Sequence, residues 1–409
     1  MKIKKVKARE ILDSRGNPTV ETEIVTEKGK YIASVPSGAS TGEHEACELR
    51  DKDSRYHGKG VQKAVANVNN EIGKEIEGMN VENQKEIDEA MLNLDGTKNK
   101  EKLGANAILS VSMAVARAGA DSKEIPLWEY ISKVSNSDPS LPYPCFNVVN
   151  GGEHAGNNLD IQEFMISPRF GSFQENLRAG SEIYHTLKEI LEKDFSSSST
   201  NVGDEGGFAP SFSKADQALS YLQKAITDAG YKKKVKIALD CAASEFYNKE
   251  KNIYEIDGEE KNVKEMIDYY KKLIDKYPIF SIEDPFGEND FKAWSGFKSE
   301  ADDLLIIGDD LLTTNPERIE KAINENSCNG LLLKINQIGT ITESIKAMKL
   351  ARSKGWKIMV SHRSGETCDN FIADLAVGLG AEFIKSGAPA RGERISKYNQ
   401  LLRIEEELK

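Results

Sequence analysis

Long hydrophobic runs and paired cysteines are both missing from this chain of 409 residues. No apolar run reaches the ~18 residues that a membrane-spanning helix needs, so an integral membrane protein is not expected. The N-terminus, MKIKKVKAREILDSRGN, is charged and lacks the apolar segment of a secretory signal peptide. The five cysteines are scattered and form no CxxC pair, which disfavours a disulfide framework or a zinc site. We therefore expect a cytoplasmic protein with free thiols.

Basic residues are also in deficit. Fifty-five Lys and Arg residues face 66 Asp and Glu residues, which gives a formal net charge of −11. Because phosphate binding needs a basic face, this balance disfavours a general nucleic-acid binder. It is compatible with an active site that gathers carboxylates around cations. The length and the 39% hydrophobic content predict two compact units, or one large barrel with a cap.

Residues 1–137 have the pattern of a small α+β domain. Polar and apolar residues alternate within 3–8, 20–24 and 31–35, which predicts three strands in an antiparallel meander. Apolar residues then recur at spacings of three and four between Ala107 and Ala118, which predicts a helix. The stretch 125–144 contains prolines and serines and resembles a connection between domains. We expect a second domain over 138–409.

Short apolar runs alternate with amphipathic helical stretches from Cys145 onward. This repeat implies parallel strands joined by crossover helices. Because a (β/α)8 barrel assembles its site at the C-terminal ends of its strands, polar residues at successive strand ends favour a barrel over an open doubly wound sheet. An unusually long interval contains the polar segment 247–261, which we expect to be a loop that could move. The polar residues that the six runs lead to are Asp240, Glu283, Asp309, Lys334, His362 and Lys385.

Asp240, Glu283 and Asp309 follow three consecutive strands, so their carboxylates are expected to converge. A cation relieves the repulsion among such groups, and an all-oxygen ligand set selects Mg²⁺ or Mn²⁺ over zinc. A helix N-cap would explain any one of these residues, but not three in succession. Lys334 comes one strand later. Beside cations its ammonium form is disfavoured, so we expect a lowered pKa and a role as a general base.

Further residues suit acid catalysis and anion binding. Glu205 lies in the glycine-rich segment GDEGG, and Glu163 lies beside apolar residues; such a pair suits a general acid with a polarising partner. Arg363 and Ser364 come just before a helical pattern, which predicts an anion site, most simply for phosphate. Lys385, on the following strand, suits a carboxylate.

Two glycine-containing loops are candidates to border the site. One is PSGASTG, whose Ser40 hydroxyl could close over the site, and the other is NGGEHAGN, which carries His154. Each loop taken alone is also typical of ordinary protein surface.

These segments together resemble the enolase (phosphopyruvate hydratase) family along essentially the whole chain. The resemblance implies an N-terminal α+β cap domain on a modified (β/α)8 barrel of the form ββαα(βα)6. It also implies the reversible dehydration of 2-phospho-D-glycerate to phosphoenolpyruvate, a lyase step of glycolysis and gluconeogenesis, with two Mg²⁺ ions per active site. The matching segments include AREILDSRGNPTVE, SVPSGASTGEHEA, NGGEHAGN, QEFMI, NVGDEGGFAP, IEDPF, LLLKINQIGT and SHRSGET.

The resemblance also implies roles for the candidate residues. Lys334 is expected to remove the C2 proton, and Glu205 to protonate the departing C3 hydroxyl with help from Glu163. Ser40 is expected to help hold the second metal ion, and the expected ligands of the first are Asp240, Glu283 and Asp309. The expected substrate contacts are His154, Glu163, Glu283, Asp309, His362, Arg363, Ser364 and Lys385.

A homodimer, or a higher oligomer built from it, is implied by the same resemblance. The expected pairs across the interface are Glu21 with Arg403 and Arg9 with Glu406. Two alternatives stay open at this point. Another Mg²⁺-dependent enzyme of the enolase superfamily, such as a racemase, would share the carboxylates and the lysine but would not need the phosphate pair. A secreted or cell-surface population could instead bind plasminogen, for which the C-terminal Lys409 is a candidate.

Overall fold

Three antiparallel strands begin the chain. In the computed structural model, which describes residues 1–38 and 42–409, β1 pairs with β2, and β2 with β3. Alternation along the strands buries Val20, Ile24 and Ala33 completely. The predicted meander is confirmed, and its strands are β1 (Lys5–Leu12), β2 (Pro18–Val25) and β3 (Lys30–Ser34).

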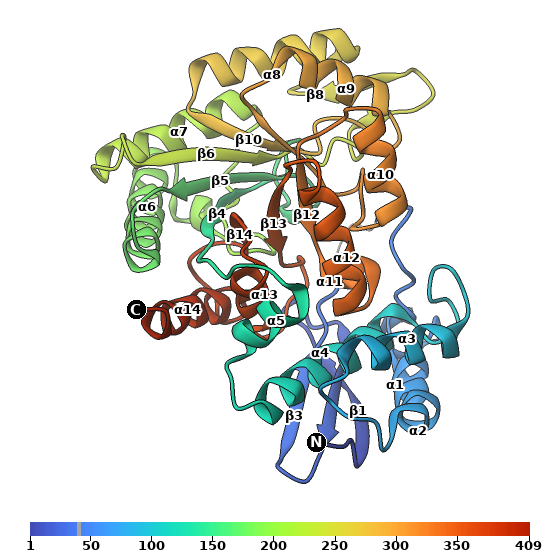
Figure 1. Ribbon diagram of the computed structural model, residues 1–409. Helices are drawn as coiled ribbons and strands as arrows, with labels where there is room; N and C mark the ends of the chain where they lie inside the picture. The colour runs from blue at the N-terminus through green and yellow to red at the C-terminus, as the bar shows by residue number, and fades with distance from the viewer. Residues whose placement is uncertain (39–41) are drawn as a thin grey trace.

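Helices pack against this sheet and complete the N-terminal part, from β1 to α5 (Figure 1). The predicted helix between Ala107 and Ala118 is α4, which contacts both β2 and β3. Small apolar residues line most of its circumference, so it is buried along nearly its whole length. The helical segments of this part are η1 (Arg55–Gly58), α1 (Gln62–Asn67), η2 (Val68–Ile72), α2 (Gly73–Ile76), α3 (Gln84–Asp95), α4 (Ala105–Ser122) and α5 (Leu127–Ser135).

Eight further strands close into a barrel, in the order β10-β11-β12-β13-β14-β4-β5-β6. β5 runs antiparallel to both of its neighbours, whereas all the other pairs are parallel. Since α6 and α7 follow β4 and β5, the form ββαα(βα)6 is confirmed. The barrel strands are β4 (Tyr143–Asn150), β5 (Glu163–Pro168), β6 (Val235–Asp240), β10 (Ile279–Glu283), β11 (Leu305–Gly308), β12 (Gly330–Leu333), β13 (Lys357–Ser361) and β14 (Phe383–Lys385).

Side-chain caps define where several outer helices begin. Asn262 and Glu265 form a reciprocal capping box, and Asn315 caps a helix whose first residue is a proline. Thr340 accepts from the backbone N–H of Glu343 at the start of another helix. The helical segments here are η3 (Gly152–His154), α6 (Phe173–Asp194), η4 (Ser197–Thr200), α7 (Ala215–Asp228), α8 (Val263–Lys276), α9 (Phe291–Glu300), α10 (Pro316–Asn324), α11 (Ile335–Ile338), α12 (Ile341–Arg352), α13 (Phe371–Gly378) and α14 (Gly392–Glu407).

The insertion between β6 and α8 corrects one expectation. Residues 247–261 are a small antiparallel sheet of β7 (Tyr247–Asn248), β8 (Ile253–Ile256) and β9 (Glu259–Lys261), not an irregular loop. Tyr254 and Ile256 are completely buried, and the Tyr254 hydroxyl accepts from the backbone N–H of Gly287 at 3.1 Å. The two alternate apolar residues anchor an otherwise polar segment to the barrel.

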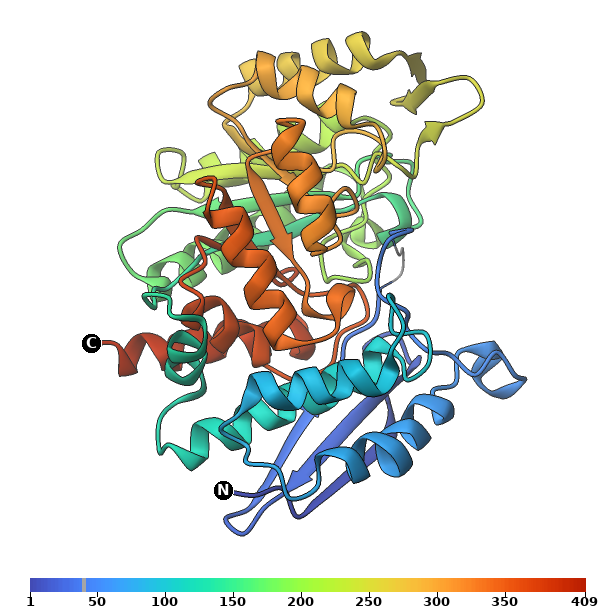
Figure 2. The ribbon, with the colours of Figure 1, turned by 45° about the vertical axis from the view of Figure 1, so that its right-hand side comes forward.

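The N-terminal part and the barrel make contact along several elements. α5 packs on α13, and the chain after β3 runs from the small sheet towards the barrel (Figures 1 and 2). Arg117 of α4 binds Asp369 through two hydrogen bonds of 2.7 Å.

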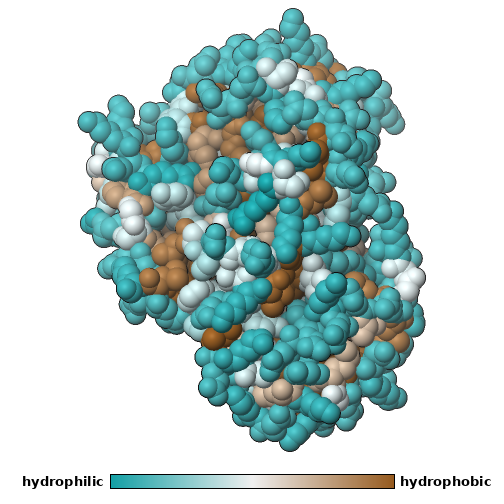
Figure 3. Space-filling view, in the orientation of Figure 1, coloured by the Kyte–Doolittle hydropathy of each residue, from teal (hydrophilic) through white to brown (hydrophobic). Residues whose placement is uncertain are grey.

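The face drawn in Figure 3 is mainly hydrophilic, with scattered hydrophobic patches. Within the described residues, no helix has the length and apolar character needed to cross a membrane.

Candidate active site

Polar residues far apart in sequence meet at one end of the barrel. Asp240 ends β6 and Glu283 ends β10, and the two are in register across the parallel pair. Glu163 begins β5, and because β5 runs antiparallel to β6, it lies opposite Asp240 at the same end. This is the mouth formed by the C-terminal ends of the parallel strands, where the sequence pattern predicted the site.

Lys385, the last residue of β14, joins these carboxylates. Its Nζ lies 2.8 Å from Glu283 Oε1, 3.0 Å from Asp240 Oδ2 and 3.2 Å from Glu163 Oε1. Burial alone would lower the pKa of Lys385, but the surrounding carboxylates raise it well above its usual value. The lysine is therefore a charged ammonium that offsets the repulsion among three buried acids.

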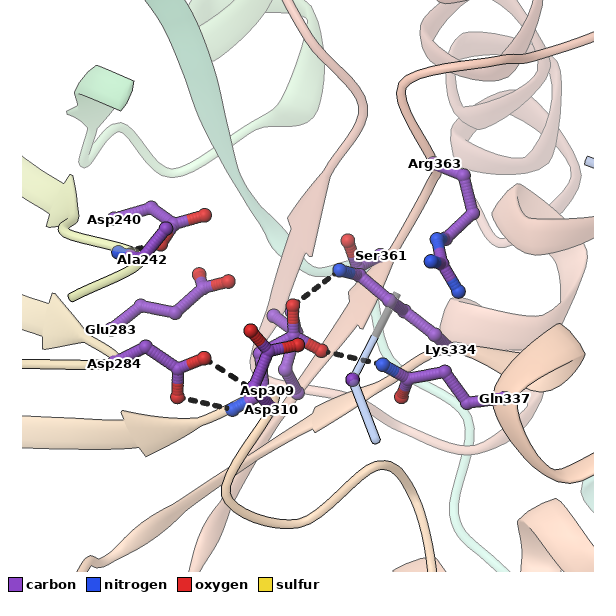
Figure 4. A network of polar contacts seen from close by, with 12 residues as sticks. Asp240, Ala242, Glu283, Asp284, Asp309, Asp310, Lys334, Gln337, Ser361 and Arg363 are labelled. Atoms are coloured by element: carbon purple, nitrogen blue, oxygen red, sulfur yellow. Dashed lines mark hydrogen bonds and ion pairs between the residues drawn. The ribbon is translucent and has the colours of Figure 1, made fainter. Parts of the chain in front are cut away.

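Lys334 and Asp309 form a second ion pair at the mouth (Figure 4). Lys334 follows β12, and its Nζ donates to Oδ2 of Asp309, which follows β11. Burial lowers the pKa of Lys334, but the charge of Asp309 outweighs burial and raises it. The sequence-based expectation of a lowered pKa applied to a lysine beside cations; beside the carboxylate of Asp309 the pKa is raised instead.

Glu205 is buried beside two imidazoles and an amide. His362 Nε2 lies 3.3 Å and His154 Nδ1 3.6 Å from Glu205 Oε1, while Asn147 donates to Oε2 at 2.9 Å. Burial lowers the pKa of His362 to about 3 and also lowers that of His154. Burial raises the pKa of Glu205, whereas the imidazoles in their charged forms lower it well below its usual value. The protons of these groups are thus coupled, as is typical of a site of proton transfer.

Arg363 and Ser364 follow β13 and face a segment of the N-terminal part. The Arg363 guanidinium donates to Glu45 at 2.8 and 3.1 Å. Glu45 lies between β3 and η1, in the stretch that runs to the barrel (Figure 2). Arg394 of α14 donates to the backbone oxygens of Arg363 and Ser364 at 2.7 and 2.6 Å, which fixes the turn that presents them.

One cavity at the barrel mouth brings the predicted set together. Glu283 is not part of its lining but contacts Lys385. Ser40, the predicted ligand of a second metal ion, lies outside the described residues. The predicted residues that line the cavity are His154, Glu163, Glu205, Asp240, Asp309, Lys334, His362, Arg363, Ser364 and Lys385.

Two family models match nearly the full length of this chain. The model of the enolase C-terminal TIM barrel domain matches residues 138–409, and that of the enolase N-terminal domain matches residues 3–131. The chain belongs to the enolase family. The family, the barrel with an N-terminal domain and the lyase activity predicted from the sequence are confirmed.

Similar relatives carry the enolase name. Enolase B of Dictyostelium discoideum is 56% identical, Enolase 1 of Entamoeba histolytica 55%, and an enolase of Methanosarcina barkeri 57%. Each alignment spans all of this chain and, in that order, 95%, 97% and 95% of the relative. The similarity is therefore to whole enolases and not to one domain.

Enolase membership implies a metal-dependent enzyme, and the residues present fit a hard divalent cation. Asp240, Glu283 and Asp309 offer only oxygen ligands, and each is already contacted by a lysine ammonium, so the cluster needs positive charge. Oε2 of Glu163 is buried with no hydrogen-bond partner among the described residues. Within that part of the chain, the groups with ligand atoms all within 4.8 Å of one another are Asp284, Asp309 and Asp310, and His154, Glu163 and Glu205.

Sequence reasoning missed the residues that orient the predicted ones. The carboxylate of Asp284 accepts the backbone N–H groups of Asp309 and Asp310 at 2.9 and 2.7 Å (Figure 4). The signal for Asp284 in the sequence was its position directly after Glu283. Glu45 and Gln337 lie within segments that match the enolase family, but no local pattern distinguishes them from ordinary surface polar residues.

Proposed function

We propose which residues at the barrel mouth carry out each step of the enolase reaction, the reversible dehydration of 2-phospho-D-glycerate to phosphoenolpyruvate. Lys334 removes the C2 proton as the general base. Glu205, assisted by Glu163, protonates the departing C3 hydroxyl as the general acid. The observation that carries this proposal is that a buried lysine and a buried carboxyl group line one cavity. An amine and a carboxyl group can each accept or donate a proton, and a shared cavity places both beside one substrate.

Asp240, Glu283 and Asp309 would hold one Mg²⁺ ion, and Ser40 would help to hold a second. When bound, the ions would supply positive charge that stabilises the negative charge developing on the substrate carboxylate. Lys385 faces the same carboxylate and adds a further charge. The all-oxygen donor set supports this assignment, as does the ammonium that already contacts Asp240 and Glu283.

Arg363 and Ser364 bind the substrate phosphate. A guanidinium and a hydroxyl on one rigid turn suit a phosphate, since both donate hydrogen bonds to its oxygens. His154 and His362 complete the pocket around the reacting carbons. Arg394 supports this part of the proposal because it braces the turn and also contacts His362 Nδ1 at 2.6 Å.

We place the domain boundary after residue 137, which separates a cap of 1–137 from a catalytic barrel of 138–409. The limits of the two family matches support this division.

A homodimer in the cytoplasm is the proposed working state. Leu12 and Ile32 of the N-terminal sheet line one surface hollow together, with 55% and 42% of their surface exposed, and this shared apolar surface supports a dimer.

The whole-length enolase match supports this reaction over that of another superfamily enzyme. The plasminogen-binding role of Lys409 stays a prediction.

The assay that tests the proposal follows the absorbance gained as phosphoenolpyruvate forms from 2-phospho-D-glycerate. We expect EDTA to abolish the reaction and added Mg²⁺ to restore it. Deuterium exchange at C2 then isolates the first proton transfer. Lys334→Ala should lose this exchange while its melting temperature stays unchanged, and undiminished exchange would overturn the assignment of the base.

A further inference from the structure

Two consecutive threonines directly behind the proposed base have an unusual backbone. Thr313 and Thr314 have φ angles of +46° and +53°, in the left-handed region. β-Branched residues rarely adopt this region, because their side chains crowd the backbone there. Both threonines are completely buried in the connection between β11 and α10. Such strain persists where surrounding contacts over-determine a conformation, and it is concentrated at functional sites.

The hydroxyl of Thr314 has three polar contacts, of which the one to the backbone oxygen of Leu332 is the longest, at 3.4 Å; the other two account for its position. Its Oγ1 accepts the backbone N–H of Lys334 at 3.0 Å and donates to the side-chain oxygen of Gln337 at 2.9 Å. A hydroxyl can do both at once, since it has one proton and two lone pairs. The first contact holds the backbone of the proposed base directly.

Gln337 passes this constraint on to Asp309. Its Oε1 takes the threonine proton, so its Nε2 must face the opposite way, and it donates to Asp309 Oδ1 at 2.8 Å (Figure 4). Gln337 is almost fully buried, with 1% of its surface exposed. With Oδ1 occupied in this way, Oδ2 of Asp309 is the oxygen that receives Lys334 Nζ.

The contacts form a closed ring that holds the lysine at both ends. It runs from the backbone N–H of Lys334 through Thr314 and Gln337 to Asp309, and returns through the lysine ammonium. We propose that Thr314 and Gln337 are positioning residues that set the orientation of Asp309 and the place of Lys334 Nζ for proton transfer. This inference rests on the proposed function of Lys334 as the base.

The physical reason is the flexibility of the two side chains that react. A lysine side chain has four rotatable bonds, and the terminal torsion of an aspartate is broad. Small displacements of a reacting group slow proton transfer severely, so a base on a flexible stem needs external restraint. Asp309 is also a proposed cation ligand, and hydrogen bonds to a ligand tune metal binding as well.

Thr314→Val tests the ring, because valine keeps the branched shape and removes only the hydroxyl. We expect kcat and the rate of C2 deuterium exchange to fall together, by about 10- to 100-fold, with little change in KM. The matched control is Thr314→Ser, which keeps the hydroxyl and should retain nearly wild-type rates. Equal losses in both variants would overturn the inference, because the rates would then not depend on the hydroxyl that Thr314→Ser keeps.

Gln337→Met provides a second test, which remains valid even if Thr314→Val fails to fold. It keeps the length of the side chain but cannot orient Asp309. We expect the same joint loss of kcat and exchange, and calorimetric titration with Mg²⁺ alone should show about tenfold weaker binding. Wild-type exchange together with wild-type Mg²⁺ affinity would overturn the positioning role. If Lys334→Ala shows normal C2 exchange, the assignment of Lys334 as the base is wrong. If Lys334→Ala loses the exchange but the Thr314 and Gln337 variants keep it, the base assignment stands and only this inference fails.

Discussion

Arg363 of the barrel and Glu45 of the N-terminal part form a buried ion pair with hydrogen bonds of 2.8 and 3.1 Å. Only 3% of the Arg363 side chain and 10% of the Glu45 side chain are exposed. Burial lowers the pKa of Arg363, but the facing carboxylate raises it by more. The pair ties the segment after β3 to the barrel mouth, so the N-terminal part forms one wall of the site.

Glu45→Gln should destabilise the protein, because it leaves a buried guanidinium without this counter-charge. We expect a loss of about 3 kcal/mol in the free energy of unfolding, measured by urea titration. Inorganic phosphate should then stabilise the variant more than the wild type, since an anion at Arg363 replaces the lost charge. Glu260→Gln, which breaks an exposed pair with Lys251, is the control and should change nothing measurable. Equal phosphate effects on variant and wild type would contradict the role of Arg363.

Glu205→Gln should separate the two proton transfers. If Glu205 acts only on the leaving hydroxyl, C2 deuterium exchange persists while net formation of phosphoenolpyruvate collapses, by about 100-fold or more. The amide keeps the shape of the side chain and can still bind Asn147, which contacts the carboxylate in the wild type. Both reactions are followed on the same sample. Their parallel loss would mean that the role of Glu205 is misassigned.

Asp88 should make stability depend on pH. Burial raises its pKa from 3.8 to about 6, although Thr342 and Gln84 donate hydrogen bonds to it. At a pH between these two pKa values, Asp88 has already lost its proton in the unfolded chain but still holds it in the folded chain. Stability therefore falls as pH rises from about 4 to about 6 and is level above that, and the contribution is roughly 3 kcal/mol.

The measurement compares Asp88→Asn with the wild type by urea unfolding at several pH values. The variant should gain stability relative to the wild type as pH rises through this window. Asp228→Asn, at an exposed position on α7, is the matched control and should show no such trend. A difference between Asp88→Asn and the wild type that stays constant from pH 4 to 7 would contradict the prediction.

Arg403→Glu tests the proposed dimer. Within one subunit, Arg9 donates to Glu21 at 2.5 Å. These two residues, which are expected to pair across the interface with Glu406 and Arg403 respectively, therefore contact each other within the N-terminal sheet. Reversing Arg403 would place two acidic side chains opposite each other in each of the symmetric contacts. We expect the sedimenting mass to shift towards the monomer, more strongly at low salt. Adding Glu21→Lys should restore part of the dimer, and an unchanged mass at micromolar concentration would make the pairing wrong.

The ends of the barrel strands were predictable because local patterns encode them. Apolar runs that stop at Asp240, Glu283 and Lys385 predicted both the barrel and the mouth at which chemistry gathers, since strand direction decides where each run ends. The insertion 247–261 was misjudged, because two alternating apolar residues, Tyr254 and Ile256, are a weak signal in a polar stretch.

The partners of the charged groups were decided by the tertiary structure. Lys385 could equally have faced solvent, and Glu45 lies 318 positions from Arg363 in sequence. Whether Lys334 meets a carboxylate or a cation reverses the direction of its pKa shift, and no local pattern carries that information. The physical reason is the difference in the distances over which the two effects act. Hydrophobic periodicity acts between neighbours along the chain, whereas charge pairing depends on distances of a few ångströms that exist only after the barrel closes against the N-terminal part.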